Sequence, residues 1–211
     1  MRRSIQLISM IKCIIFDLGG VVIDFTNDRH YYPYLSRVSG VSVRKIKRLI
    51  EGKMWAELDK DLLPQKEFDR KVAKKLGIMM KDVKWYELYK KEAKIEKGTI
   101  DLLRKLRRKY VIAYLSNVDR SRYTETTVEL LKPYLKLFDY RFASCEIRLR
   151  KPTRSVFRYV LKHMKVKSSE AVFIDNTLEN VKGARRVGIK GILFKNAKDL
   201  ERQLKKSGIS F

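Results

Sequence analysis

The sequence predicts an α/β fold, a doubly wound parallel sheet that carries an inserted α-helical cap. Two observations favour this fold. From Gly98 to the C-terminus, short apolar runs rich in β-branched residues alternate with segments of helical periodicity. A further apolar run stands alone near the start, and residues 25–96, which separate it from the others, show a helical pattern throughout. The helical block is therefore expected to interrupt a single sheet after its first strand.

The first element is a buried strand. Ile11–Phe16 is an apolar run rich in β-branched residues, and Asp17 ends it, as expected for a strand covered on both faces. The pattern then becomes helical. Ser42 can cap one helix, and Pro64 suits the first turn of another, which Gly77 ends. No strand is evident in this block.

The later elements alternate between helix and strand. Thr99 is expected to cap the helix before the second strand, and Thr177 a later helix, with Asn180 in the reciprocal capping position. The last helix is predicted from Ala197 to Lys206. The remaining strands are expected at Tyr110–Leu115, Phe142-Ala143, Ala171–Ile174 and Ile192–Phe194.

The domain organisation follows from this order of elements. Residues 10–24 and 97–211 are assigned to the α/β core, residues 25–96 to the helical cap, and residues 1–9 to an N-terminal extension. A signal peptide is the alternative for the start of the chain, but Lys12 interrupts the apolar stretch and no small-x-small cleavage site follows. No apolar run approaches the roughly 20 residues of a membrane helix.

Composition limits the class of protein. Hydrophobic residues make up 45% and charged residues 35% of the chain, as in a globular protein. Cys13 and Cys145 belong to no CxxC or Cys/His cluster, which argues against a zinc site or a disulfide framework and favours a cytoplasmic protein. The net charge of +25 suggests nucleic acid as a partner, but the basic residues are spread over nearly every predicted helix. Nucleic acid is therefore possible and not favoured.

Polar residues stand where the predicted strands end. These positions are Asp17, Ser116-Asn117 and Asp175-Asn176, and Lys151 follows a fourth candidate strand. Ligands of open parallel sheets bind outside the carboxyl ends of the strands, so these side chains are expected to converge. Two acids close together repel unless a cation such as Mg²⁺ lies between them, and a lysine with a hydroxyl suits phosphate. Each residue alone could merely end a strand or cap a helix.

At these residues the chain resembles a known family. Four segments, in this order and spacing, are similar to the four motifs of the haloacid dehalogenase superfamily over nearly the whole chain. Residues 55–68 also resemble the helical cap of a subgroup that includes sugar-phosphate phosphatases and the phosphatase domain of soluble epoxide hydrolases. The four segments are Ile14–Val22, Leu115–Asn117, Arg150–Pro152, and Val172–Asn176 with Glu179-Asn180.

The resemblance implies a Mg²⁺-dependent phosphatase that acts on a small phosphomonoester. Asp17 would attack phosphorus and form an aspartyl-phosphate, which divides the reaction into two displacements. Asp17, the backbone carbonyl of Gly19 and Asp175 would hold Mg²⁺, with Asn176 supporting that site.

It also implies a phosphate site. Ser116 and the backbone near Asn117 would bind phosphate oxygens. Lys151 would neutralise charge on the nucleophile and on the developing transition state. The cap would shield this site and select the substrate.

Two departures from the family pattern bear on activity. Family phosphatases usually carry a second aspartate two residues after the nucleophile, which protonates the leaving group, and this chain has Gly19 there. Without this proton donor, the rate would be expected to be lower by roughly 10²–10⁴-fold. Asp24 and Asp28 are nearby in sequence. Many relatives also have a second acid at the position of Asn176.

Other functions stay open. One is a catalytically weak or inactive relative that binds a partner, for example a polyanion on the basic surface, and such binding should fall steeply with salt. A 2-haloacid dehalogenase is less favoured; Arg29 would be its candidate halide ligand, but a solvated surface arginine fits that position better. His30 and the tyrosines beside it could line the substrate pocket, although core packing is favoured.

Overall fold

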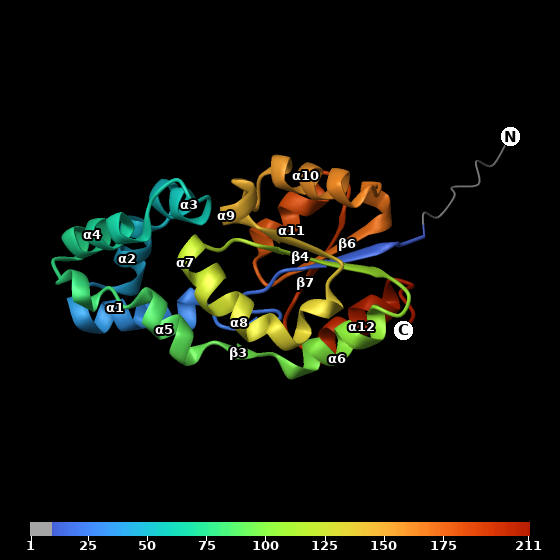
Figure 1. Cartoon of the computed structure of the whole chain (residues 1–211), viewed down its shortest axis with the longest axis horizontal. Coiled ribbons are helices and arrows are strands. Elements are labelled where there is room, and N and C mark those ends of the chain that lie inside the picture. The colour runs from blue at the N-terminus through green and yellow to red at the C-terminus, as the bar shows by residue number, and fades with distance from the viewer. Residues whose placement is uncertain (1–9) are drawn as a thin grey trace, which may run out of the picture.

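A five-stranded parallel sheet forms the centre of the molecule (Figure 1). The computed structural model describes residues 10–211, so the predicted N-terminal extension lies outside the described residues. The strands lie in the order β5-β4-β1-β6-β7. The direction of strand progression reverses between β1 and β6, the point at which ligands bind in doubly wound sheets. The five strands are β1 (Cys13–Phe16), β4 (Val111–Ser116), β5 (Tyr140–Ala143), β6 (Ala171–Asp175) and β7 (Lys190–Leu193).

Helices cover both faces of the sheet (Figure 1). Alternate residues of β1 explain why it is apolar throughout: Ile14 and Phe16 pack in one hydrophobic cluster, and Cys13 and Ile15 pack in another. The first cluster includes α6 and α12, and the second includes α10. The helices of the core are α6 (Lys97–Leu106), α7 (Arg120–Arg122), α8 (Val128–Leu131), α9 (Ser144–Ile147), α10 (Arg154–Met164), α11 (Leu178–Arg185) and α12 (Ala197–Lys206).

A helical block lies beside the sheet and is joined to it by two short strands (Figure 1). The chain leaves the core through β2 (Ile23–Asp24) and returns through β3 (Lys94–Ile95), and these strands pair antiparallel, with Ile23 opposite Ile95. We call residues 25–93 the cap. Its helices are α1 (Tyr32–Ser39), α2 (Val43–Ile50), α3 (Lys53–Asp59), α4 (Gln65–Leu76) and α5 (Trp85–Glu92).

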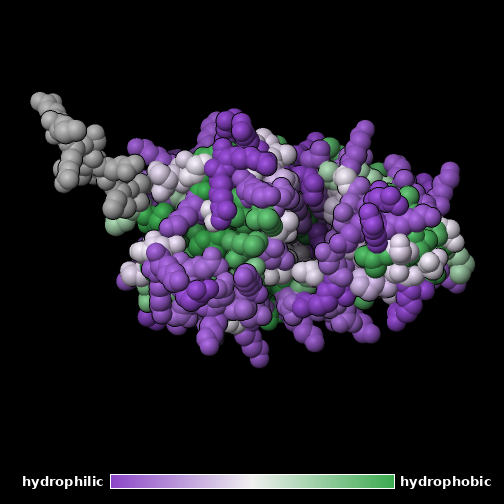
Figure 2. Space-filling model, turned by 180° about the vertical axis from the view of Figure 1, so that it is seen from behind, coloured by the Kyte–Doolittle hydropathy of each residue, from purple (hydrophilic) through white to green (hydrophobic). Residues whose placement is uncertain are grey.

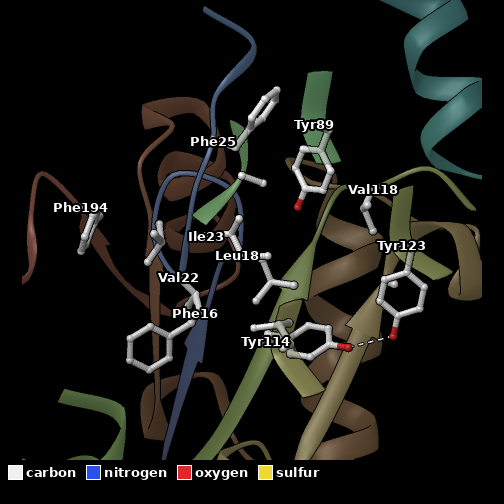
Figure 3. Packing of buried hydrophobic residues seen from close by; sticks show 14 of the residues in the cluster. Phe16, Leu18, Val22, Ile23, Phe25, Tyr89, Tyr114, Val118, Tyr123 and Phe194 are labelled. Carbon is white, nitrogen blue, oxygen red and sulfur yellow. Dashed lines mark hydrogen bonds between the residues drawn. The ribbon is translucent and has the colours of Figure 1, made fainter. Parts of the chain in front are cut away.

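Aromatic rings build the interior of the cap. Trp55 packs edge-on against Phe68 at a centroid distance of 5.1 Å and against Trp85 at 5.4 Å. Tyr31 is fully buried 4.5 Å from the ring of Trp85, so core packing explains this tyrosine as expected. The same hydrophobic cluster reaches the sheet, and in Figure 3 it continues from β1 toward the ring of Tyr89 on α5.

The elements differ locally from expectation. The sequence predicts Thr99 as a helix cap, but α6 begins a few residues earlier and Thr99 is buried inside it. Glu96 is the N-cap, and its carboxylate accepts from the Gly98 N–H at 3.2 Å, because a longer acidic side chain also reaches a free N–H of the first turn. The strand β3 lies in a stretch expected to hold none, and as a two-residue strand it has too few residues to show alternation. Within residues 10–211, no helix combines the length and the apolarity that crossing a bilayer requires.

Candidate active site

Three of the predicted site residues meet at the carboxyl ends of β1 and β6. The register places Phe16 opposite Ile174, so Asp17 and Asp175 follow on neighbouring strands. The Lys151 ammonium lies between them, 2.7 Å from Asp17 Oδ1 and 2.8 Å from Asp175 Oδ2. All three side chains are at most 10% exposed, so water screens this cluster weakly.

The charges of the cluster are not balanced. Two carboxylates face one ammonium in a buried place. Burial, reinforced by repulsion from Asp175, raises the pKa of Asp17 to about 7, although Lys151 acts in the opposite direction. Burial lowers the pKa of Lys151, but the two carboxylates outweigh burial and raise it above its usual value. A further cation at this place would therefore favour the ionised form of Asp17.

Asp175 is held rigidly by its own surroundings. Its Oδ1 accepts from the Thr177 N–H at 2.7 Å, and its Oδ2 accepts from the Asn180 amide at 3.1 Å. Asn180 was expected to cap α11 with Thr177, but its side chain is directed to Asp175, and Thr177 makes no side-chain capping bond. A carboxylate that accepts several hydrogen bonds stays in one orientation.

The loop after β4 is tied to the loop that carries Lys151. The Asn117 amide donates to the Lys151 carbonyl at 3.0 Å, and Asn117 Oδ1 accepts from the Lys151 N–H at 2.9 Å. This pair positions Lys151. It uses the Asn117 Oδ1 and one hydrogen of the NH₂ group, so the Asn117 side chain is held against the Lys151 backbone. Ser116, at the end of β4, is 4% exposed and lies beside the same cleft.

The loop after β1 contains two glycines that differ in their surroundings. Gly20 has a φ of +77°, and a Cβ there would lie 2.1 Å from the Asn176 amide nitrogen, so only glycine fits against Asn176. At Gly19 a Cβ would meet only the Phe25 carbonyl oxygen, at 3.7 Å. Among residues 10–211, no hydrogen bond to the Gly19 carbonyl oxygen is observed, so this oxygen can serve as a ligand.

A cleft of about 690 Å³ lies between the core and the cap. Figure 2 shows a hollow between these two parts on a largely hydrophilic face. The cap contributes aromatic and acidic side chains to its wall, among them Phe25, Trp55 and Asp59. Asp175 does not line the cleft but lies behind Lys151, fully buried. The predicted site residues that do line it are Asp17, Gly19, Ser116, Asn117, Lys151 and Asn176.

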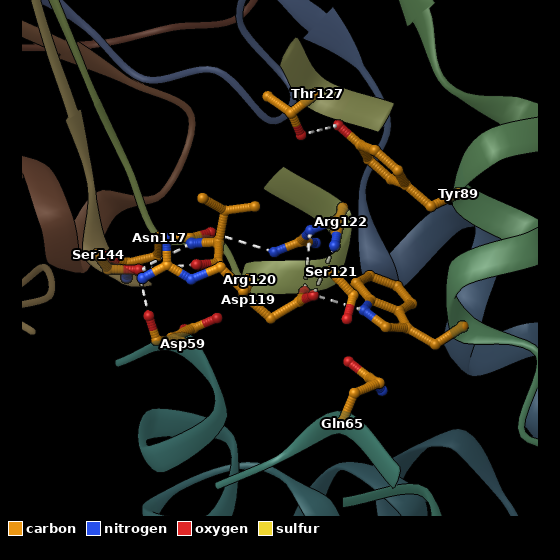
Figure 4. A network of polar contacts seen from close by, with 12 residues as sticks. Asp59, Gln65, Tyr89, Asn117, Asp119, Arg120, Ser121, Arg122, Thr127 and Ser144 are labelled. Carbon is orange, nitrogen blue, oxygen red and sulfur yellow. Dashed lines mark hydrogen bonds and ion pairs between the residues drawn. The ribbon is translucent and has the colours of Figure 1, made fainter. Parts of the chain in front are cut away.

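Sequence reasoning missed a polar network between the core and the cap (Figure 4). Arg150 Nη2 lies 3.0 Å from Asp59 Oδ2, and the Trp85 indole donates to Asp119 Oδ2 at 3.3 Å. The Arg122 guanidinium lies 4.8 Å from the Trp85 ring centroid and 3.2 Å from Asp119. The only sequence signal was Arg150, which precedes Lys151 in the third motif.

The other candidate residues from the sequence lie away from the cluster of Asp17, Lys151 and Asp175. Asp24 and Arg29 form an ion pair with each other, and neither lines the cleft, so Asp24 does not replace the missing acid there. Asp28 lines the cleft but is 69% exposed and paired with Lys47. His30 stacks on Phe25 at 4.9 Å and does not line the cleft.

Solved structures share this fold. An HAD family enzyme from Bacteroides thetaiotaomicron superimposes with a TM-score of 0.75 at 25% identity, covering 92% of this chain and 98% of that one. The same enzyme in complex with magnesium and inorganic phosphate gives a TM-score of 0.72, with the same coverage and identity. A 2-haloacid dehalogenase from Pseudomonas syringae is similar in fold alone, with a TM-score of 0.58 at 16% identity.

Several named proteins are also similar to this chain in sequence. D-ribitol-5-phosphate phosphatase of Bacteroides thetaiotaomicron is 23% identical over 204 residues, 92% of this chain and 97% of that protein. Sesquiterpene phosphatase of Aspergillus oryzae is 25% identical over 183 residues, which cover 86% of this chain and 88% of that protein. Drimenol cyclase of Aspergillus calidoustus is 26% identical over 200 residues, but the match spans only 36% of that protein. The family model for haloacid dehalogenase-like hydrolases matches residues 11–188, and the chain thus belongs to that family.

Proposed function

We propose that this protein is a Mg²⁺-dependent phosphatase that cleaves a small phosphomonoester through an aspartyl-phosphate at Asp17. The observation that carries the proposal is the buried cluster in which Lys151 bridges Asp17 and Asp175 at the reversal point of the sheet. Phosphatases among the relatives support this reaction over halide displacement, since two of them are named for cleaving phosphate.

The residues present fit Mg²⁺. The donor atoms offered near Asp17 are oxygens only: two carboxylates and the Gly19 carbonyl, which takes no hydrogen bond from residues 10–211. Mg²⁺ prefers such hard ligands and keeps several waters, so it does not need a larger cluster of acidic side chains. When bound, the ion would neutralise the charge of the carboxylates and of the phosphate. Asp17, Gly19 and Asp175 would hold it, and Asn176 would support them.

Asp17 carries out the first displacement. One carboxylate oxygen bonds to phosphorus while the ester P–O bond breaks, and the electron pair of that bond leaves with the alkoxide. Lys151, fixed through Asn117, keeps a positive charge beside the Asp17 carboxylate. Ser116 and the backbone at Asn117 bind the equatorial phosphate oxygens.

The second displacement regenerates the enzyme. A water molecule attacks the phosphorus of the aspartyl-phosphate, the bond between Asp17 and phosphorus breaks, and inorganic phosphate leaves. Gly19 supplies no side chain to protonate the alkoxide, so that proton comes from solvent in the cleft. Turnover is therefore expected to depend strongly on how easily the alcohol leaves.

Phosphate release tests the proposal. Wild type should release phosphate from a panel of phosphomonoesters with Mg²⁺ and lose this activity in EDTA. Asp17→Asn should lower the rate at least about 10⁴-fold while remaining folded, because the nucleophile is removed. If folded wild type releases phosphate from no ester, or if Asp17→Asn retains turnover, the aspartyl-phosphate mechanism is wrong. Steeply salt-dependent binding of a polyanion in that case would favour the binding-protein alternative.

A further inference from the structure

One buried carboxylate oxygen lacks a partner, and it belongs to a residue that lines the cleft. Asp59, the last residue of α3, lines the cleft from the cap side, and its side chain is 2% exposed. Its Oδ2 accepts from Arg150 Nε at 3.2 Å and lies 3.0 Å from Arg150 Nη2. Its Oδ1 is buried and has no hydrogen-bond partner among residues 10–211. Burying such an acceptor is unfavourable unless a ligand or water satisfies it.

The position of Asp59 is fixed relative to the predicted phosphate site (Figure 4). Its backbone carbonyl accepts from Ser144 Oγ at 2.7 Å, and the same hydroxyl accepts from the Val118 N–H at 2.9 Å. Val118 follows Asn117, and Arg150 precedes Lys151. Asp59 is therefore held by its carboxylate to the loop that carries Lys151, and by its backbone carbonyl, through Ser144, to the loop that carries Asn117.

We propose that Asp59 Oδ1 accepts a hydrogen bond from a hydroxyl group on the leaving group, so that the cap selects hydroxylated phosphomonoesters over hydrocarbon ones. The inference rests on the proposed phosphatase function and names the residue that determines its specificity. An ionised carboxylate only accepts hydrogen bonds, so it repels a second phosphate and requires a donor.

Two neighbours define the kind of donor. Arg150 already balances the charge of Asp59, and Arg122 is near enough to act on it as well, so a cationic ammonium gains little there and a neutral hydroxyl suffices. Trp55, one helical turn before Asp59 on α3, also lines the cleft. A hydroxylated carbon chain can place its C–H groups on this ring while a hydroxyl reaches Asp59.

The substrate side of the proposal is tested with pairs of esters that share a carbon chain. n-Pentyl phosphate and a pentitol phosphate differ only in their hydroxyl groups. Wild type should show a kcat/KM about 10–10²-fold higher for the pentitol ester, the discrimination expected from a hydrogen bond to a charged acceptor. Equal kcat/KM values for the two esters would overturn the proposal.

The protein side is tested with variants. In Asp59→Asn the amide oxygen must face Arg150, which only donates, so an NH₂ group replaces Oδ1 and the preference should fall about 5–10-fold. Asp59→Ala should remove the preference, measured as the ratio of kcat/KM for the pentitol ester to kcat/KM for n-pentyl phosphate. Asp61→Asn is the control, because Asp61 also forms a core-to-cap ion pair, with Arg120 at 3.2 Å, but is more exposed and does not line the cleft. The control should keep the wild-type preference.

The outcomes separate this proposal from the proposed function. If Asp59 and Asp61 variants lower turnover of both esters in parallel, Asp59 only docks the cap and the proposal fails. If wild type hydrolyses no ester, the phosphatase function fails, and calorimetry with the folded Asp17→Asn protein still decides the inference. Tighter binding of the pentitol ester, lost in Asp17→Asn/Asp59→Ala, supports it, and equal affinities overturn it.

Discussion

Gly19→Asp is expected to add the proton donor that this chain lacks. The backbone of Gly19 does not adopt a left-handed φ, and a Cβ would meet only the Phe25 carbonyl oxygen at 3.7 Å, an ordinary van der Waals contact. A Cβ is therefore accommodated without strain at a residue that lines the cleft. Because the cleft is already rich in carboxylates, the new group should have a raised pKa, which suits a proton donor.

The size of the gain should depend on the leaving group. Protonating an alkoxide contributes about 10²–10⁴-fold, or roughly 3–5 kcal/mol of transition-state stabilisation, so kcat for an alkyl phosphate should rise by that factor. A phenolate that leaves well without a proton should show little change. The assay is steady-state phosphate release at pH 6–8 from an alkyl phosphate and from p-nitrophenyl phosphate.

Gly19→Asn is the matched control, since it has the same size and cannot transfer a proton. An equal gain in both variants would show that packing of the loop, and not proton transfer, limits turnover. No gain on the alkyl ester in folded Gly19→Asp would refute the idea that a missing acid limits the rate.

Three further perturbations test other parts of the structure. Gly20→Ala forces a left-handed φ on alanine and places its Cβ 2.1 Å from the Asn176 amide nitrogen, so chemical denaturation should show a loss of about 1–3 kcal/mol. Asn117→Ala frees the Lys151 backbone, and kcat should fall about 10-fold with a smaller change in KM, measured by phosphate release. Burial raises the pKa of Asp69 to about 6 from 3.8. Its folded state thus binds a proton more tightly, and this residue's contribution to stability falls as pH rises from about 4 to 6. Asp69→Asn should therefore be more stable than wild type by about 1–3 kcal/mol at pH 7 and lose that advantage below pH 4, as denaturation at the two pH values will show.

The sheet was predictable because its signals are local. β1, β4 and β6 are apolar up to their carboxyl ends, as expected for strands covered on both faces, and a polar residue ends or follows each of them. The meeting of Asp17, Asp175 and Lys151 followed from the same facts, since parallel strands end at one edge of the sheet. Their chemical roles remain proposals that the experiments above decide.

The contacts of the cap were not predictable, because they depend on how it docks. Asp59 and Arg150 are 91 residues apart in the chain and form their pair only through the docked cap. The role of the Asn117 side chain could not be predicted either, because its partner is the backbone of Lys151, 34 residues away. Every residue has the same backbone groups, so the sequence does not indicate which of them a side chain will bind. Pairing of two short strands at the entrance of the cap likewise has no periodicity to detect.

The charge of the cleft is opposite to that of the whole chain, and this bears on function. The chain carries a formal charge of +25. The cleft nevertheless has five carboxylates in its wall against three cations, so a phosphate monoester entering it alone meets a net negative wall. The surface charge can draw anions toward the protein, and the net negative charge of the cleft supports the proposal that Mg²⁺ accompanies the phosphate there. The charged groups of the wall are Asp17, Asp28, Glu51, Asp59 and Glu179, with Arg122, Arg150 and Lys151.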